Sequence, residues 1–172
     1  MFAFIHLIGA WSTGKLYEQW KKQPLEHTTW FFLLFGALLP DVDFLLDWTR
    51  GTEIHRTMTH SLLFVVVAFV LVHFIFTAML KKPEGPHYAF ALSAGIITHL
   101  LLDMIASQGV PLFWPSLVHV SFIHIGYFDP ATPSFLHGSP DVLRRVMKVM
   151  ILDMAAGAAW IFWLWWKKKV TF

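Results

Sequence analysis

Histidines and aspartates lie within three short segments of otherwise apolar sequence. Burying such ionisable side chains in hydrocarbon is costly, and they usually mark function. Imidazole nitrogen and carboxylate oxygen together form a ligand set that suits zinc and related divalent metals. The sequence therefore predicts a metal site, held by residues that occur in pairs along the chain: Asp41 and Asp43, His55 and His60, His99 and Asp103.

The third pair has the most informative spacing. His99 and Asp103 are four residues apart, so a helix places them on one face, one turn from each other. Two ligands at this spacing can bind one ion together, or the carboxylate can bridge two adjacent ions. The alternative is a His–Asp hydrogen bond that ties two helices together. We favour metal binding because the other two pairs accompany this one.

Asp41 and Asp43 flank Val42 in the segment Leu-Pro-Asp-Val-Asp. In an extended turn their side chains point to opposite sides. Two anions at an apolar boundary repel each other unless a cation lies between them. We expect Asp41 to be a direct ligand and Asp43 to be a ligand or to support one. Ordinary helix capping and solvation at a membrane edge is the alternative.

His60 directly precedes Ser61, where a membrane helix is expected to begin. A helix N-terminus disfavours the imidazolium form and keeps a ring nitrogen free for a metal. His55, five residues earlier, is a further candidate ligand. Arg56 has the guanidinium that pairs with phosphate, although anchoring at the membrane interface explains it equally well.

Two more residues are candidates because of where they are expected to lie. His6 is a lone histidine in an apolar helix, and on its own it would be interpreted as structural. Asp129 occupies a rigid turn before Pro130. With Asp43, it is a candidate general base. Asp153 is expected to support the site or to be an interhelical hydrogen-bond partner. The loop histidines, any of which would complete the site, are His119, His124 and His137.

Composition places the chain among membrane proteins. Of 172 residues, 56% are hydrophobic and only 14% are charged, against about 25% charged in soluble domains. Cysteine is absent, so any metal must be held by His, Asp or Glu. The lysine clusters resemble membrane flanks, and they form no basic patch of the kind that binds nucleic acid.

The predicted fold is an all-α membrane bundle, with residues 1–172 forming one domain. A span needs about 20 apolar residues. About five membrane helices are expected, over residues 2–20, 30–39, 61–80, 88–106 and 146–166. Residues 108–141 are rich in proline and aromatic side chains and predict an interfacial or re-entrant loop. Pro140, in a first turn, indicates that the last helix starts close to it.

Basic residues determine the expected orientation. The positive-inside rule places Lys21, Lys22, Lys81, Lys82 and the lysines from Lys167 onward in the cytoplasm. The N-terminus then lies outside and the C-terminus inside. This arrangement brings the metal-site motifs, His6 included, to the outer half of the inner (cytoplasmic) membrane.

The order of the motifs resembles the YdjM-type family of inner-membrane-associated, LexA-binding, metal-dependent hydrolases. The pattern consists of an early histidine, Leu-Pro-Asp-x-Asp, His-Arg-x-x-Thr-His-Ser, Thr-His-x-x-x-Asp, Gly-Val-Pro-x-x-Trp-Pro and a late Asp-Pro. In this chain these elements begin at His6, Leu39, His55, Thr98, Gly109 and Asp129. The resemblance covers nearly the whole chain and implies a metal-dependent hydrolase.

A more distant likeness is to zinc-dependent phospholipase C and related single-strand nucleases. Those all-helical enzymes bind zinc through an early histidine, a loop aspartate, a helical histidine and a His-x-x-x-Asp pair. The matching residues occur here in the same order: His6, Asp41, His60, His99 and Asp103. The chain lacks the late His-x-x-x-Glu of those enzymes, so we expect one or two ions rather than three.

The function expected from the sequence is hydrolysis of a phosphoester, such as a phospholipid or lipid phosphate, by metal-activated water. The expected cofactor is a divalent metal, with zinc favoured. The expected partners are the lipid bilayer and a lipid-like substrate, while the sequence leaves the oligomeric state open. The alternative is a non-enzymatic metal-binding membrane protein that acts in transport or as a regulatory partner.

Overall fold

The structure is a computed structural model, which describes residues 3–50, 57–105, 109–116, 118–122, 125–127 and 140–167. Helices dominate the described residues. The α-helices are α1 (Ala3–Lys21), α2 (His27–Gly36), α3 (Val42–Arg50), α4 (Leu62–Phe74), α5 (Gly85–Asp103) and α6 (Pro140–Trp166). Shorter elements are the 3-10 turns η1 (Leu39–Asp41) and η2 (Met58–His60), and the π turn η3 (Ile75–Met79), which extends α4.

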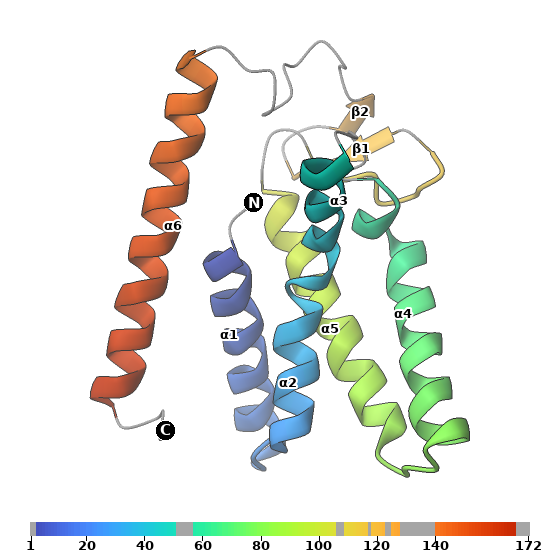
Figure 1. Cartoon of the computed structure of the whole chain (residues 1–172). Helices are drawn as coiled ribbons and strands as arrows, with labels where there is room; N and C mark the ends of the chain where they lie inside the picture. The colour runs from blue at the N-terminus through green and yellow to red at the C-terminus, as the bar shows by residue number, and fades with distance from the viewer. Residues whose placement is uncertain are drawn as a thin grey trace.

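Helix α5 forms the centre of the bundle and packs against α1, α2 and α4, while α6 lies along α1 at one edge (Figure 1). One core cluster joins α4 to α5 and contains Val65, Ala68, Leu92, Ile96 and Leu100. The α1–α2 turn, the α4–α5 turn and the C-terminal end of α6 lie at the same end of the molecule (Figure 1). The start of α4 and the end of α5 lie at the opposite end, where the metal-site motifs meet.

Two glycines allow α2 and α5 to approach at backbone distance. A Cβ atom on Gly95 would lie 2.1 Å from the carbonyl oxygen of Leu33, and one on Gly36 would lie 2.2 Å from that of Leu92. Any larger residue would force the two helices apart. This close crossing determines how far the end of α2 lies from the end of α5, and both ends contribute to the site.

The expected helix start at Ser61 is present, since the Ser61 hydroxyl accepts a hydrogen bond from the Phe64 N–H at 3.2 Å. The extended turn expected around Asp41 is wrong. Asp41 ends the 3-10 turn η1, and Asp43 lies in the first turn of α3. Pro40, which has no N–H to donate, fits the start of such a turn.

The region expected to be loop contains two short strands, β1 (Val118–Val120) and β2 (Ile125–Tyr127). They pair antiparallel, with His119 opposite Gly126. The chain is therefore mostly helical, as expected, but an all-α description omits this hairpin. Strands of three residues carry too little alternation to stand out in the sequence.

Two segments are long and apolar enough to cross a membrane, Leu62–Met79 and Met147–Trp166. Both run from the metal-site end toward the end that carries the α4–α5 turn (Figure 1). The lysine pairs at the ends of α1 and α4 lie at that same far end. The five-span arrangement and its orientation in the membrane stay predictions.

Candidate metal centre

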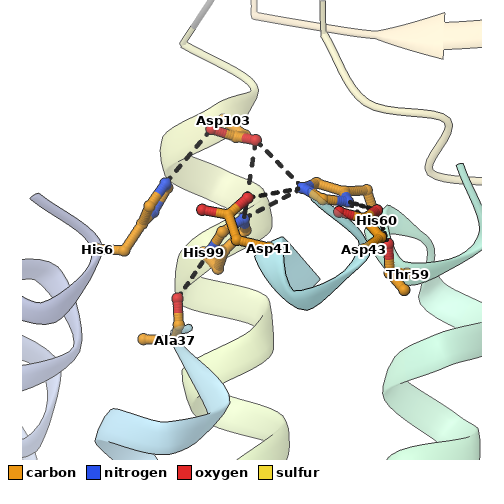
Figure 2. A network of polar contacts seen from close by, with 8 residues as sticks. All are labelled: His6, Ala37, Asp41, Asp43, Thr59, His60, His99 and Asp103. Atoms are coloured by element: carbon orange, nitrogen blue, oxygen red, sulfur yellow. Dashed lines mark hydrogen bonds and ion pairs between the residues drawn. The ribbon is translucent and has the colours of Figure 1, made fainter. Parts of the chain in front are cut away.

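Four donor atoms from three parts of the chain converge at one end of the bundle (Figure 2). They are Asp41 Oδ1 from η1, His60 Nε2 from η2, and His99 Nε2 and Asp103 Oδ2 from α5. His99 and Asp103 share a face because they are four residues apart on α5. Ser61, by starting α4, fixes the chain directly after His60.

The separations that involve the two imidazole Nε2 atoms are nearly equal. His60 Nε2 lies 3.3 Å from His99 Nε2, 3.6 Å from Asp41 Oδ1 and 3.5 Å from Asp103 Oδ2. His99 Nε2 lies 3.6 Å from Asp41 Oδ1 and 3.7 Å from Asp103 Oδ2. A regular tetrahedron with ligand distances of about 2.0–2.2 Å has edges of about 3.3–3.6 Å. The distances from each imidazole nitrogen to the other donors are therefore close to those between ligands of one tetrahedral ion.

The other nitrogen of each imidazole is occupied by a group that orients the ring. His99 Nδ1 lies 2.7 Å from the Ala37 carbonyl oxygen, which can only accept, so this nitrogen carries the proton. His60 Nδ1 lies 3.1 Å from the Thr59 hydroxyl, which in turn donates to Asp43. Such outer partners leave Nε2 as the ligand atom and hold the ring in position.

His6 extends the cluster on the side of α1. Its ring stacks on that of His99, with centroids 3.8 Å apart and planes at 19°. His6 Nε2 lies 3.5 Å from Asp103 Oδ1, the oxygen that faces away from the first four donors. Among the described residues, neither ring nitrogen of His6 has a hydrogen-bond partner. Buried polar atoms are normally satisfied, so the His6 ring is a candidate ligand. Asp103 has one oxygen near His6 and the other near His60.

The accessible side of the cluster is the side of Asp41. The side chains of His6, His60, His99 and Asp103 are at most 3% exposed, whereas that of Asp41 is 19% exposed.

The site carries strongly coupled charges. Burial disfavours the ionised form of Asp41, but a hydrogen bond with His60 and nearby imidazole charge hold the pKa of this carboxyl well below its usual range. Burial also disfavours a charged His60, yet three surrounding carboxylates raise the pKa of its imidazole to about 10. A cation between these carboxylates is therefore favourable. In the metal-free protein, the proton on His60 occupies the position that a metal ion would take.

The structure brings together five of the predicted ligands: His6, Asp41, His60, His99 and Asp103. Asp43 lies 3.5 Å from His60 Nδ1, on the outer side of the ring, which favours the supporting role over that of a direct ligand. His119 lies in β1. The remaining candidates lie outside the described residues: His55, Arg56, Asp129, His124 and His137.

Two contributors were not anticipated from the sequence in these roles, and a third, Asp153, takes one of the two roles predicted for it. Ala37 acts through its backbone carbonyl, which no side-chain pattern reveals. Thr59 could have been suspected from its place beside His60 in the sequence Met-Thr-His-Ser. Asp153 is an interhelical hydrogen-bond partner: its carboxylate accepts from the backbone N–H groups of Phe4 and Ile5 in α1.

Comparison with known proteins agrees with the motif pattern. The family model described as YdjM inner membrane protein matches residues 1–170. The Inner membrane protein YdjM of Escherichia coli (strain K12) is 41% identical over 97 residues, which cover 48% of this chain and 46% of that protein. The protein of the same name from Shigella flexneri matches equally.

A protein of Bacillus subtilis (strain 168), the Uncharacterized protein YvsG, is 30% identical over 96 residues, which cover 49% of this chain and 56% of that protein. The chain thus spans about half the length of the curated relatives it matches. No solved structure matches. Because the family model covers nearly every residue, the predicted family membership is confirmed, and the chain belongs to the YdjM inner membrane protein family.

Proposed function

We propose that the chain is a membrane-embedded, metal-dependent hydrolase of phosphoesters. One observation carries the proposal: the buried Nε2 atoms of His60 and His99 lie close to each other and to carboxylate oxygens of Asp41 and Asp103, at the separations of ligands that share a metal ion. His60, His99, Asp103 and Asp41 would hold the first divalent ion, with zinc favoured by the nitrogen and oxygen donors. His6 and the second oxygen of Asp103 are the donors for another ion.

A divalent ion in this site would supply a lowered pKa for bound water and positive charge for phosphate oxygens. The protein residues supply positioning. Asp43, through Thr59, orients His60, and Ala37 orients His99. Asp41 lies at the accessible side, where a substrate phosphate would enter. Arg56 as a phosphate contact and Asp129 as a general base stay predictions from the sequence.

A lipid-like substrate is supported by the surroundings of the accessible side. Val42 follows Asp41 and is 46% exposed, while Met58 and Leu62 flank His60 and are 45% and 41% exposed. Apolar side chains exposed next to buried polar donors suit a molecule that has both an apolar chain and a charged head. Membership of an inner membrane protein family provides the bilayer in which such a substrate is found.

A second candidate function is supported by the same four donors. Four protein ligands fill a tetrahedral zinc site, and closed sites of this kind are structural, whereas catalytic sites keep one position open. The chain would then be a metal-binding membrane protein without turnover. A hydrolase needs an open ligand position on its metal ion. Either Asp41 would give up its ligand position on the first ion, or the ion beside His6 would have the open position.

Turnover by purified protein separates the two functions. The protein in detergent micelles is freed of metal, reloaded with zinc or manganese, and assayed with bis-p-nitrophenyl phosphate and with phosphatidic acid in mixed micelles. Metal-dependent release of product that disappears in His99→Ala, but not in His87→Ala at the opposite end of the same helix, supports the hydrolase. Binding of stoichiometric metal without turnover of either compound supports the non-enzymatic metal-binding protein instead.

A further inference from the structure

We propose that Asp153 of α6 is a positioning residue for His6, and that α6 thereby sets the geometry of the metal centre. The inference rests on the proposed function in one respect, which is that His6 takes part in metal binding. Asp153 touches none of the metal donors in the contacts described above. It acts through the backbone at the start of α1.

The contact itself is well defined. Asp153 is 7% exposed, and its two carboxylate oxygens accept hydrogen bonds from Phe4 N at 3.2 Å and Ile5 N at 3.0 Å. These N–H groups lie in the first turn of α1, which has no carbonyl partner of its own to offer them. The first turn also contains no acidic residue. A carboxylate from a neighbouring helix therefore satisfies the helix end and complements its dipole.

The position of this carboxylate is unusual for a membrane helix. Asp153 lies within Met147–Trp166, one of the two segments suited to span a membrane. A carboxylate at such depth is costly and marks function by default. The packing of α6 against α1 does not require a charged side chain, because apolar contacts already join the two helices. Gly157 lies against the ring of Phe4, and Trp11 makes edge contacts with Trp160 and Trp163, both with centroids 5.9 Å apart.

Apolar contacts hold two helices together but resist sliding poorly, whereas two directed hydrogen bonds fix the register. His6 follows Ile5 directly and stacks on His99. A one-residue slip of α1 would move its ring by about 1.5 Å along the helix axis. Metal–ligand distances tolerate only about 0.2 Å. The carboxylate therefore holds His6 at the depth at which its Nε2 faces Asp103 Oδ1.

A double-mutant cycle tests this link. Zinc and cobalt affinities are measured for the full chain and for Asp153→Ala, His6→Ala and the double variant. We expect Asp153→Ala to weaken binding about tenfold, as supporting residues around metal ligands do, and to cause no further loss once His6 is absent. Asp153→Asn, which keeps one accepting oxygen, should lose less. Trp163→Phe, at the same interface, is the control and should leave affinity unchanged.

The result that overturns the inference is equal weakening by Asp153→Ala with and without His6, or equal weakening by Trp163→Phe. Either would make Asp153 a general docking residue. A second measurement separates this failure from failure of the proposed function. The ¹⁵N resonances of the His6 ring in metal-free protein should shift in Asp153→Ala and stay in place in Trp163→Phe. If the unaltered chain binds no zinc, the metal proposal fails, and these resonances alone decide whether Asp153 positions His6.

Discussion

His60 and His99 turn their Nε2 atoms toward each other across 3.3 Å, with ring planes at 67°. Each ring is held in this pose through its other nitrogen, by Thr59 and by the Ala37 carbonyl respectively. Two lone pairs at this distance repel each other unless a cation lies between them, and two carboxylates add to that demand. A shared proton would satisfy the arrangement in the metal-free protein, and a divalent ion would satisfy it in the proposed metal site.

His99→Ala should abolish tight metal binding. It removes a central donor, and even a change in a residue that only supports a ligand costs about 10–100-fold in affinity. The metal content of purified protein, measured by mass spectrometry, should fall to background. His87→Ala, a histidine in the first turn of the same helix, should retain full content. Equal metal content in His99→Ala and in the unaltered protein would contradict the site.

Asp103→Asn should be more damaging than its size suggests. The amide keeps the shape of the side chain but loses the negative charge that attracts the ion. Asp103 also contacts both sides of the cluster, with Oδ1 near His6 and Oδ2 near His60. We expect metal-dependent turnover, if the chain is a hydrolase, to fall by at least about 100-fold, or about 3 kcal/mol of transition-state stabilisation. Circular dichroism checks that the helices remain. Full turnover in this variant would exclude Asp103 as a ligand.

Thr59→Val tests the support behind His60. Valine has a similar shape but cannot accept from the His60 ring or donate to Asp43. We expect a 10- to 100-fold weaker zinc affinity, about 1.4–2.8 kcal/mol, with the ligands themselves intact. Thr13→Val is the matched control, since it removes a threonine hydroxyl that bonds within α1 and to Thr98, away from the donors. An equal effect of both substitutions would argue that lost packing, not ring orientation, is responsible.

The convergence of the candidate ligands could be predicted because their chemistry is rare in an apolar sequence. His99 and Asp103 are four residues apart inside a helix that hydropathy identifies, so their shared face followed directly. Their meeting with Asp41 and His60 followed from the order and direction of the helices. Side-chain type and helix topology together therefore predicted which residues meet at one end of the bundle.

Other features depended on contacts that the sequence does not encode locally. The end of α2 was expected at Leu39, but the chain changes to a 3-10 turn there. The role of Ala37 is a backbone property of the C-cap of α2. Gly36 and Gly95 are ordinary small residues until α2 and α5 are known to cross at these points. Asp153 could be recognised as anomalous in an apolar helix, yet its partner, the start of α1, is nearly 150 residues away.

Gly95→Ala should disturb both the fold and the site. The added Cβ would lie 2.1 Å from the Leu33 carbonyl oxygen and 2.9 Å from Ala37 N, so α2 must move away from α5. Overpacking of this kind costs about 1–3 kcal/mol. The shift also stretches the 2.7 Å contact between Ala37 and His99. We expect a lower Tm in detergent and weaker zinc binding together. The control Ile97→Ala, on an exposed face of α5, should lower neither the Tm nor the zinc affinity appreciably. Wild-type values of both for Gly95→Ala would contradict the close crossing of α2 and α5.

Stability of the metal-free protein should depend on pH through His60. The surrounding carboxylates raise the pKa of its imidazole to about 10 in the folded chain, against about 6.5 when unfolded. A raised folded pKa stabilises the fold fully below about pH 6.5, and this contribution is lost as the pH rises through about 10. Asp41 acts in the opposite direction, since its lowered pKa gives a contribution that is lost in acid.

Zinc takes the position of the His60 proton, so it should preserve the stability that deprotonation removes. The increase in Tm caused by stoichiometric zinc should therefore grow from pH 6 to pH 9, and metal-dependent activity should fall in acid as protons compete for the ligands. Thermal unfolding in detergent at several pH values, with zinc or with chelator, measures this directly. His60→Ala should remove the dependence on both zinc and pH in this range. A zinc effect that is the same at pH 6 and pH 9 would show that the ion does not displace a proton from this histidine.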